Sequence, residues 1–484
     1  MTTQTSAWLL RNRRTKIIAT LGPATDNAES IAKLIDTGVD VFRLNMSHGD
    51  QSGHREVYER VRAAAQAAGR HIAILADLCG PKIRVGILDS GHMTLTEGAT
   101  VTVTTRDVVG GDGLIPSQYE DLHKDCSVGD RILLADGIME LEVKAVEGQD
   151  ISCTVVQGGE LTNRKGINLP GVDVCAPALT PKDVDDAEFA LGLGVDFLAQ
   201  SFVRRAADVE QLQSIIKAAE HSALVIAKIE RPEAVVEIDS ILDVADGIMI
   251  ARGDLGVELP PEEVPIAQDT LVHRARARNR PVIVATQMLE SMIENARPTR
   301  AEVADVAHTV LSGADAIMLS AETATGAHPL LAVEMMDRVA RQSEGSLWRK
   351  GAFGSVTLDD DVTPPIPFGD AVARSTAQLS RDLMVRAIAV FTHSGMSAIT
   401  LSSARPAAPV VSVSASDSTC RLMNLMWGVI PVLVSATDYA NPVDTSRALV
   451  RNLALADDDE FILLVRGFSG AKETNTPSVT LLSV

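Results

Sequence analysis

Val225-Ile226-Ala227-Lys228-Ile229-Glu230 is an apolar, partly β-branched run that ends with a cation and an anion two positions apart. Such a run predicts a buried strand, and alternation along a strand places Lys228 and Glu230 on the same side. An ammonium and a carboxylate at one strand end suit an anionic substrate that is bound through a metal, although a plain internal salt bridge would also put them there. The functional interpretation gains weight because the pattern recurs along the chain.

Seven further segments show a short apolar run with polar residues at its C-terminal end, followed by a helical pattern. These segments are residues 15–22, 41–47, 71–79, 197–202, 247–254, 281–288 and 316–322. Eight strands that alternate with helices predict an α/β fold, a closed parallel (β/α)8 TIM barrel. Because chemistry in such barrels lies at the C-terminal strand ends, the polar ends are the candidate functional residues.

Two stretches, residues 81–176 and 346–484, depart from this pattern of barrel strands and helices. Residues 81–176 alternate with period two between Gly and Asp turns, which predicts an all-β domain inserted after the third strand. The barrel then comprises residues 1–80 and 177–345. Strand-like segments separated by helices follow, and they predict a C-terminal doubly wound α/β domain over 346–484.

The first strand of this C-terminal domain opens into Thr392-His393-Ser394-Gly395-Met396-Ser397. A turn rich in Ser and Gly before a helix offers backbone N–H groups and hydroxyls to an anion. Most turns of this composition are only loops, so the motif by itself is a weak indication of phosphate binding.

The composition excludes several classes of partner. With 44 basic and 64 acidic residues the net charge is −20, which argues against nucleic acid and against anionic membranes. No apolar run approaches the ~18 residues of a membrane span, and no signal-peptide pattern begins the chain, so we expect a soluble cytoplasmic protein. The five scattered cysteines predict neither a disulfide framework nor a zinc site.

Six motifs together closely resemble those of pyruvate kinases. They are Leu21-Gly22-Pro23-Ala24-Thr25, Phe42-Arg43-Leu44-Asn45-Met46-Ser47-His48-Gly49, Lys165-Gly166-Ile167-Asn168-Leu169-Pro170-Gly171, Lys228-Ile229-Glu230, Ala251-Arg252-Gly253-Asp254-Leu255-Gly256 and Ala285-Thr286-Gln287-Met288-Leu289-Glu290. Each is weak alone, but together they are specific, and the resemblance runs from about Arg14 to the C-terminus. It implies the same three-part architecture, with the inserted domain as a β-barrel lid, and a cytoplasmic homotetramer. The implied reaction transfers phosphate from phosphoenolpyruvate to ADP, giving ATP and an enolate that is protonated to pyruvate, the final step of glycolysis.

The resemblance also implies roles for individual charged residues. Glu230 and Asp254 would bind the divalent cation, Mg²⁺ or Mn²⁺, for which hard carboxylates are suitable ligands. Lys228 and Arg43 would neutralise the phosphoryl group during its transfer.

The remaining implied roles concern the bound substrates. The substrate carboxylate would rest on the backbone N–H groups of Gly253 and Asp254 and on the hydroxyl of Thr286. The nucleotide would contact His48, Arg84 and Lys165, although Lys165 could also be a solvated hairpin lysine. The proton for the enolate would come through water and the hydroxyls of Thr286 and Ser320, with Glu322 behind them.

One departure from many members of that family concerns K⁺. Those enzymes hold K⁺ at positions that match Asn45, Ser47, Asp77 and Leu78, and they carry glutamate in a Gly-Pro-Glu motif. Here the motif is Gly80-Pro81-Lys82, and Leu78 stands where they have threonine. A lysine ammonium can supply the charge of a bound K⁺ from within the chain, so K⁺ is not expected to be required. A neutral exchange at a hinge is the alternative.

Two other functions stay open at this point. A barrel with Glu230 and Asp254 at its strand ends also resembles metal-dependent aldolases that act on pyruvate enolate, although an aldolase would not need Lys165 or the pair Arg43 and Lys228. A catalytically silent, effector-binding homologue is the second alternative. The loop formed by Thr392, His393, Ser394, Gly395 and Ser397 lies where the family binds phosphorylated effectors. Met396, however, lacks the basic side chain of the fructose-bisphosphate-responsive forms.

Overall fold

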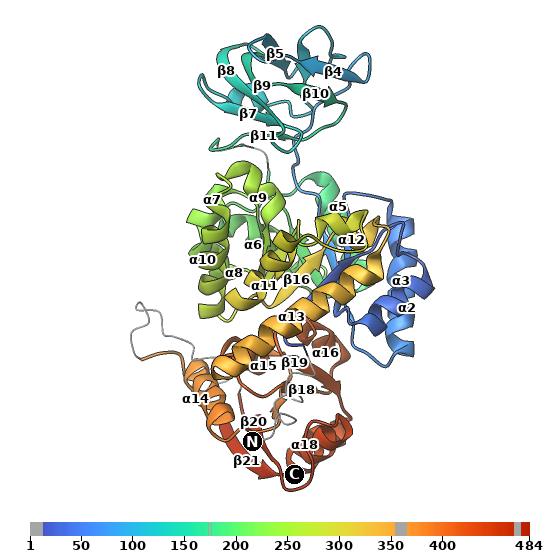
Figure 1. The fold of residues 1–484 in the computed structure, drawn as a ribbon, viewed down its shortest axis with the longest axis vertical. Helices are drawn as coiled ribbons and strands as arrows, with labels where there is room; N and C mark the ends of the chain where they lie inside the picture. Colours follow the sequence, from blue (N-terminus) through green and yellow to red (C-terminus); the bar gives the residue numbers. More distant parts are fainter. Residues whose placement is uncertain (1–12, 173, 176, 354–364, 469–475) are drawn as a thin grey trace.

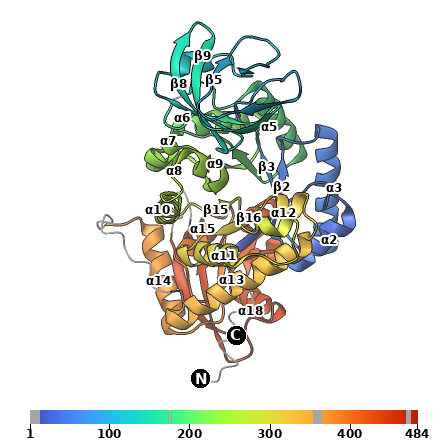
Figure 2. The same ribbon diagram turned by 45° about the horizontal axis from the view of Figure 1, so that its top comes forward.

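The computed structural model describes residues 13–172, 174–175, 177–353, 365–468 and 476–484. Three bodies follow one another along the long axis of the molecule (Figure 1). The β-rich inserted segment lies at the end of the barrel where α7 and α9 are found, and the C-terminal segment lies at the opposite end (Figures 1 and 2). No helix within the described ranges is both long and apolar enough to cross a membrane.

Eight parallel strands close into a barrel in the order β1-β16-β15-β14-β13-β12-β3-β2. Their bounds are β1 Lys16–Thr20, β2 Val41–Asn45, β3 Ala73–Asp77, β12 Phe197–Gln200, β13 Leu224–Ile229, β14 Gly247–Ala251, β15 Val282–Ala285 and β16 Ala316–Leu319. Seven of the eight predicted segments contain one of these strands and the run 225–230 overlaps β13, so the predicted TIM barrel is confirmed. Nearly all of their residues are buried, as expected for parallel strands that are covered on both faces.

Helices surround the barrel and fix the loops at its ends. The main ones are α2 Ala28–Thr37, α3 Gln51–Ala67, α5 Pro181–Leu193, α6 Ala206–Ala218, α8 Ile238–Val244, α10 Val264–Ala277, α11 Arg300–Ser312 and α13 Pro329–Gly351; shorter turns are α7 Pro232–Val236, α9 Arg252–Glu258, η1 Glu290–Ile293 and α12 Ala321–Ala324. Capping boxes at Thr180 and Thr299 begin α5 and α11, because each hydroxyl and the acid three residues later satisfy backbone N–H groups. The strand predicted over 247–254 is shorter than expected, since Arg252 already begins α9.

The inserted segment forms two sheets around its own apolar core. The six-stranded sheet has the order β11-β7-β8-β9-β5-β6, and β10 pairs with β4 in a second sheet. The bounds are β4 His92–Leu95, β5 Thr100–Thr104, β6 Leu114–Pro116, α4 Leu122–Asp125, β7 Arg131–Leu134, β8 Met139–Glu147, β9 Asp150–Gln157, β10 Gly159–Thr162 and β11 Ile167–Asn168. The all-β character is as predicted apart from the one-turn helix α4, but the described strands make an open sheet and a separate pair instead of the expected β-barrel.

The C-terminal segment is a five-stranded sheet in the order β19-β18-β17-β20-β21. Its elements are α14 Phe368–Asp382, β17 Ile388–Phe391, α15 Met396–Ser403, β18 Val410–Ser414, α16 Asp417–Met423, β19 Val429–Leu433, α17 Ala436–Ala440, α18 Pro442–Asn452, β20 Phe461–Arg466 and β21 Ser478–Ser483. Four strands are parallel and flanked by helices, as predicted, whereas β21 adds an unpredicted antiparallel edge.

Buried polar contacts join this C-terminal sheet to the N-terminal ends of the barrel strands. Arg405 pairs with Asp315 at 2.8 Å, and both side chains are buried. The Nζ of Lys16 donates to the carbonyl of Val429 at 2.7 Å. Because residues of the barrel interior and of the C-terminal sheet also share one apolar cluster, the two bodies are packed as neighbours within a common core.

Candidate active site

Asp77 lies at the centre of the charged cluster at the barrel mouth. Its Oδ2 accepts a hydrogen bond from Nε of Arg43 at 2.6 Å, and its Oδ1 lies 3.3 Å from Nζ of Lys228. Burial alone would raise the pKa of Asp77, but Lys228 and Arg43 outweigh it and hold this pKa below its usual value. Arg43 also donates to the hydroxyl of Thr20 at 3.1 Å. The sequence had suggested Asp77 only as a K⁺ position, and Thr20 not at all.

Lys228 and Glu230 face one another as the strand alternation predicted. The distance between Nζ of Lys228 and Oε1 of Glu230 is 2.8 Å, and the same ammonium donates to Oγ of Ser201 at 2.6 Å. Burial lowers the pKa of Lys228, but Asp77 and Glu230 together raise it by more, so the pKa lies above its usual value and the side chain stays an ammonium ion. Ser201 ends the neighbouring barrel segment, and its contact depends on packing between two strands.

Two carboxylates, Glu230 and Asp254, form the candidate metal centre. Burial raises the pKa of Glu230, Lys228 lowers it, and Asp254 raises it again, so the two carboxylates are close enough to influence one another. The amide of Phe202 donates to Oε2 of Glu230 at 2.7 Å and fixes its orientation. Within the described residues no three or more His, Cys, Asp or Glu side chains converge on one point. Two carboxylates without further protein ligands fit Mg²⁺, which keeps waters and takes substrate oxygens as its remaining ligands.

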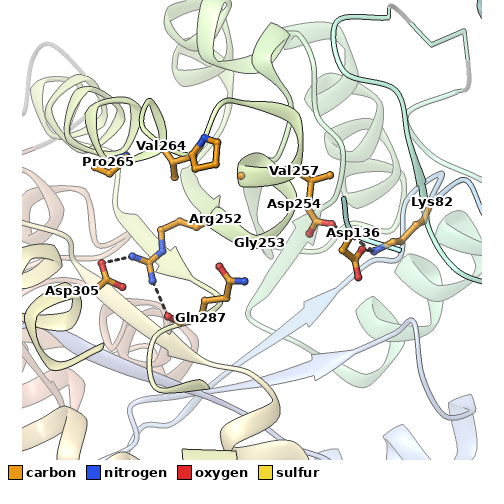
Figure 3. A pocket seen from close by; sticks show the side chains of 12 residues that line it. Lys82, Asp136, Arg252, Gly253, Asp254, Val257, Val264, Pro265, Gln287 and Asp305 are labelled. Atoms are coloured by element: carbon orange, nitrogen blue, oxygen red, sulfur yellow. Dashed lines mark hydrogen bonds and ion pairs between the residues drawn. The ribbon is translucent and has the colours of Figure 1, made fainter. Parts of the chain in front are cut away.

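Arg252 holds together the loops that follow β14 and β15. Its Nη2 donates to the carbonyl of Thr286 at 2.9 Å. Its Nη1 pairs with Asp305 at 2.6 Å (Figure 3). Thr286 and Gln287 have φ values of 70° and 55°, a left-handed conformation that is costly for a β-branched residue. We conclude that the Arg252 clamp maintains a strained turn at the barrel mouth.

The predicted cradle for a carboxylate is assembled at this turn. The amide of Gly253 donates to Oγ1 of Thr286 at 2.7 Å. A Cβ atom at position 253 would lie 3.3 Å from that hydroxyl oxygen, tighter than ordinary contact, which explains why glycine stands here. Gly253 and Asp254 belong to the first turn of α9 and not to a strand end. Their N–H groups therefore have no partner within the helix and can donate to other groups.

A cavity of about 640 Å³ opens beside the cradle, and Lys82 lines it together with Asp254 and Asp136 (Figure 3). The Nζ of Lys82 is 3.5 Å from Oδ1 of Asp254 and 3.8 Å from Oδ1 of Asp136. Asp77, which matches a K⁺ position of the family, is paired with Arg43 and Lys228. The ammonium of Lys82, the expected substitute for K⁺, faces Asp254 of the candidate metal centre.

The remaining candidates for the K⁺ position are held mainly by backbone contacts. The side-chain oxygen of Asn45 accepts from the amide of Ser47 at 3.2 Å. Leu78 is buried, and its carbonyl accepts from the hydroxyl of Ser201 at 2.8 Å.

The three candidate nucleotide contacts occupy different surfaces. Arg84 donates to the carbonyl of Arg164 at 3.3 Å, and the amide of Val85 donates to the carbonyl of the exposed Lys165. Arg84 and Lys165 therefore lie on two neighbouring backbone segments of the inserted segment. His48 is exposed on the barrel, where its carbonyl is bonded to the ring of His54 at 2.8 Å.

Glu322 is buried and joins two loops. Its Oε2 accepts from the amide of Ser320 at 2.7 Å, and its Oε1 accepts from the amide of Leu289 at 3.1 Å. The hydroxyl of Ser320 is buried and has no hydrogen-bond partner among the described residues. A buried hydroxyl in that state is costly, which suits a group whose partner arrives with the substrate.

The suspected effector loop borders a second cavity, of about 860 Å³, in the C-terminal segment. Thr392, His393, Ser394, Met396 and Ser397 line one side of it, and the amide of Gly395 donates to the hydroxyl of Thr392 at 3.0 Å. Arg466, at the end of β20, lines the same cavity. Sequence reasoning missed this cation because it is far from the loop along the chain.

Comparisons with known proteins agree over the length of the chain. The family model described as pyruvate kinase, barrel domain matches residues 12–333, and the one described as pyruvate kinase, alpha/beta domain matches residues 370–480. The pyruvate kinase of Mycobacterium intracellulare is 44% identical over 444 residues, covering 90% of this chain and 91% of the relative. That of Corynebacterium efficiens is 43% identical over 474 residues, covering 97% and 98%. The crystal structure of a pyruvate kinase from Cryptosporidium parvum superimposes with a TM-score of 0.91 at 35% identity, covering 98% of this chain and 97% of that one.

Proposed function

Because this chain belongs to the pyruvate kinase family, we propose that the charged cluster at the ends of β2, β3 and β13 carries out its phosphoryl transfer. The chain is a phosphotransferase that moves the phosphoryl group of phosphoenolpyruvate to ADP, giving pyruvate and ATP in the last step of glycolysis. A divalent metal cation is required in this family. The aldolase and the silent homologue are therefore dropped as alternatives.

The observation that carries the proposal is the shared counter-ion Asp77. It holds the ammonium of Lys228 and the guanidinium of Arg43 on either side of one buried carboxylate. Phosphoryl transfer depends on positioning and on positive charge around the transferring oxygens. Cations that are already fixed need no reorganisation when charge develops, so Lys228 and Arg43 can stabilise the transition state directly.

Glu230 and Asp254 are the proposed ligands of the cation, which we expect to be Mg²⁺ or Mn²⁺. When bound, this cation acts as a Lewis acid toward the substrate oxygens. The ammonium of Lys228 lies 2.8 Å from Oε1 of Glu230 and compensates the charge of this carboxylate. Burial raises the pKa of Glu230 above its usual value, and the ammonium of Lys228 opposes that rise, which favours the ionised carboxylate that a metal needs as a ligand.

The cradle at Gly253 and Thr286 is the proposed site of the substrate carboxylate. The amide of Gly253 would exchange the hydroxyl of Thr286 for a carboxylate oxygen, and this hydroxyl would turn from the carbonyl of Ala285 to donate to the carboxylate as well. Ser320 and Thr286 then carry a proton toward the enolate through water, while Glu322 positions Ser320 by accepting from its amide.

The finer properties expected from the sequence stay proposals. They are the nucleotide contacts His48, Arg84 and Lys165, activity without K⁺, a phosphorylated effector in the cavity beside Ser394 and Arg466, the homotetramer, and the domain limits at residues 80, 176 and 345. The proximity of Lys82 to Asp254 supports the K⁺ proposal, because one fixed positive charge lies next to a proposed metal ligand. A cytoplasmic location likewise stays a prediction.

A coupled assay tests the proposed function. Pyruvate formation, followed through its reduction by NADH, should require phosphoenolpyruvate, ADP and Mg²⁺ together, and a chelator should abolish it until Mg²⁺ is restored in excess. Arg43→Met, which removes one of the two cations that share Asp77, should reduce the rate by about 10²–10³-fold. Full turnover in that variant would refute the role given to the cluster.

A further inference from the structure

Glu258 is a buried carboxylate to which the proposed chemistry assigns no role. It is the last residue of α9, one helical turn beyond Asp254, and its side chain is 1% exposed. Its Oε1 accepts from Nδ2 of Asn168 at 3.1 Å and lies 3.3 Å from Nη1 of Arg231. Burial raises the pKa of Glu258 above its usual value, although Arg231 and Asn168 lower it.

The partners of Glu258 come from distant parts of the chain. Asn168 lies on β11 in the inserted segment, three residues after Lys165. Arg231 directly follows Glu230, and its Nη2 donates to the carbonyl of Val172, where the inserted segment returns to the barrel. One carboxylate therefore joins the inserted segment to the two elements that carry Glu230 and Asp254.

A small cavity adjoins this junction. Its volume is about 40 Å³, and its lining includes Lys82 from the outgoing connection, Asn168 from the returning one, and Arg231 and Glu258 from the barrel. Both connections of the inserted segment thus pass the same point. Among the described residues, Asn168 donates to Glu258, Arg231 donates to the carbonyl of Val172, and Arg204 donates to the carbonyl of Val174, so each of these contacts shares in holding the inserted segment over the barrel mouth.

We propose that Glu258 is a positioning residue which holds the inserted segment, through Asn168, in register with the metal ligands Glu230 and Asp254. The inference rests on the proposed roles of Arg84 and Lys165, because those cations belong to the part that Asn168 ties down. Glu258 itself does not touch the reacting groups. Its loss misplaces the nucleotide side of the site, while the enolate side, formed by Thr286 and Ser320, belongs to the barrel alone.

The proposal distinguishes two partial reactions. Phosphoryl transfer to ADP needs the inserted segment in place, whereas exchange of the methyl protons of pyruvate with solvent needs only the barrel face. A hydrogen bond to a charged group that is lost in this way reduces a rate or an affinity by roughly ten- to a hundredfold. We therefore expect Asn168→Ala to lower kcat/KM for ADP at least about tenfold, and to leave the proton exchange within about twofold of the original rate.

Charge and pairing can be separated with further variants. Asn168→Asp sets a second carboxylate against Glu258 and should lower kcat/KM for ADP more than Asn168→Ala does. In the double variant Asn168→Asp/Glu258→Gln, the glutamine amide can donate to the new aspartate, so this bond is restored with donor and acceptor reversed. Part of the lost activity toward ADP should return.

Glu233→Gln is the matched control. Glu233 also pairs with Arg231, at 3.0 Å, but it lies on α7 and is bonded neither to Asn168 nor to Val172. Its kcat/KM for ADP should stay close to that of the original chain. Amide hydrogen exchange over residues 165–172, measured on the full chain, should accelerate in Asn168→Ala and not in Glu233→Gln.

Equal loss of phosphoryl transfer and of proton exchange in Asn168→Ala would overturn the proposal, because a defect of α9 as a whole would then be the cause. Unchanged kcat/KM for ADP with unchanged hydrogen exchange would overturn it too, as would an equal effect of Glu233→Gln. A failure of the proposed function is recognised separately, because the unsubstituted chain would then form no pyruvate.

Discussion

The Nζ atom of Lys82 lies 3.5 Å from the Oδ1 atom of Asp254, while Asp136 of the inserted segment faces the same ammonium at 3.8 Å. A covalently held positive charge thus stands between a proposed metal ligand and the inserted segment (Figure 3). Unlike a bound K⁺, it is present at every ionic composition of the solution. The positive charge of Lys82 therefore lies beside Asp254, whereas Asp77 is paired with Arg43 and Lys228.

The first prediction is activity without K⁺. The chain should reach its full rate with Mg²⁺ and a bulky organic cation, and added KCl should act only through ionic screening. Lys82→Glu would place a third carboxylate beside Asp254 and Asp136 and should lower the rate by at least about tenfold, with partial recovery in K⁺. Lys217→Glu, on the exposed end of α6, serves as the control. An unsubstituted chain that stays inactive until K⁺ is added would refute the assignment.

Sequence patterns could predict the barrel because each strand has a sequence pattern of its own that can be recognised without the rest of the chain. An apolar run with a polar end needs no knowledge of its neighbours, and alternation alone put Lys228 and Glu230 on one side. The same logic extended the strand to Asp254. The apolar run 247–251 is followed by Arg252, Gly253 and Asp254, and the structure shows that α9 already begins at Arg252.

Contacts across distant segments could not be predicted. Asp77 becomes the partner of Arg43 and Lys228 only through the closure of the barrel, in which β3 lies between β2 and β12. The contact of Lys82 with Asp136 comes from a distant turn of the inserted segment, where Asp136 has a left-handed φ of 57°. Period-two alternation indicates strands but not their order, so an open sheet and a closed barrel look alike in the sequence.

The second prediction concerns the metal ligands. Asp254→Asn and Glu230→Gln keep the side-chain volume but remove a charge that a divalent cation requires, so each should abolish pyruvate formation and weaken Mn²⁺ binding at least about tenfold. Titration with Mn²⁺, followed by electron paramagnetic resonance, measures the affinity independently of turnover. Glu237→Gln, an exposed glutamate seven residues after Glu230, is the comparison. Unaltered Mn²⁺ affinity in both substituted chains would exclude these residues as ligands.

The third prediction separates the two halves of the reaction at Lys228. Lys228→Met should slow phosphoryl transfer by about 10²–10³-fold, because a cation aimed at the transferring group is lost. Exchange of pyruvate protons should fall much less, since it involves no phosphoryl charge. Asp77 retains Arg43 as its partner in this variant, which limits the damage to the fold. If both rates fell equally, Lys228 would instead be needed to position Glu230.

The fourth prediction concerns the cavity beside Ser394. Ser394 is exposed, so Ser394→Glu can be accommodated and should repel a phosphorylated ligand there, whereas Ser397 is 5% exposed and a glutamate in its place would disturb the packing. Activation by sugar phosphates or nucleotides should disappear while the maximal rate is unchanged. Ser375→Glu, on the exposed face of α14, is the matched substitution. A normal response of Ser394→Glu would place the effector elsewhere.

The last prediction links pH to the junction between the barrel and the C-terminal sheet. Burial lowers the pKa of Lys16 to about 8, with Asp40 opposing this and Arg13 adding to it. In the unfolded chain Lys16 keeps its usual pKa of 10.5, so between about pH 8 and 10.5 the unfolded state binds more protons than the folded one. Stability at this site therefore rises with pH through that window, because the folded protein no longer buries a charged amine.

The size of this effect follows from the two pKa values. A shift of the lysine pKa from 10.5 to about 8 means that burying the charged amine costs roughly 3 kcal/mol more than burying the neutral amine. Lys16→Met carries no charge at any pH, so its stability relative to the original chain should decline by about that amount from pH 7.5 to pH 10.5. Urea unfolding at both pH values, followed by the fluorescence of the buried Trp348 and Trp427, measures the difference. A Lys217→Met variant should show no such dependence, and a constant difference between Lys16→Met and the original chain would mean that Lys16 keeps its ordinary pKa in the folded protein.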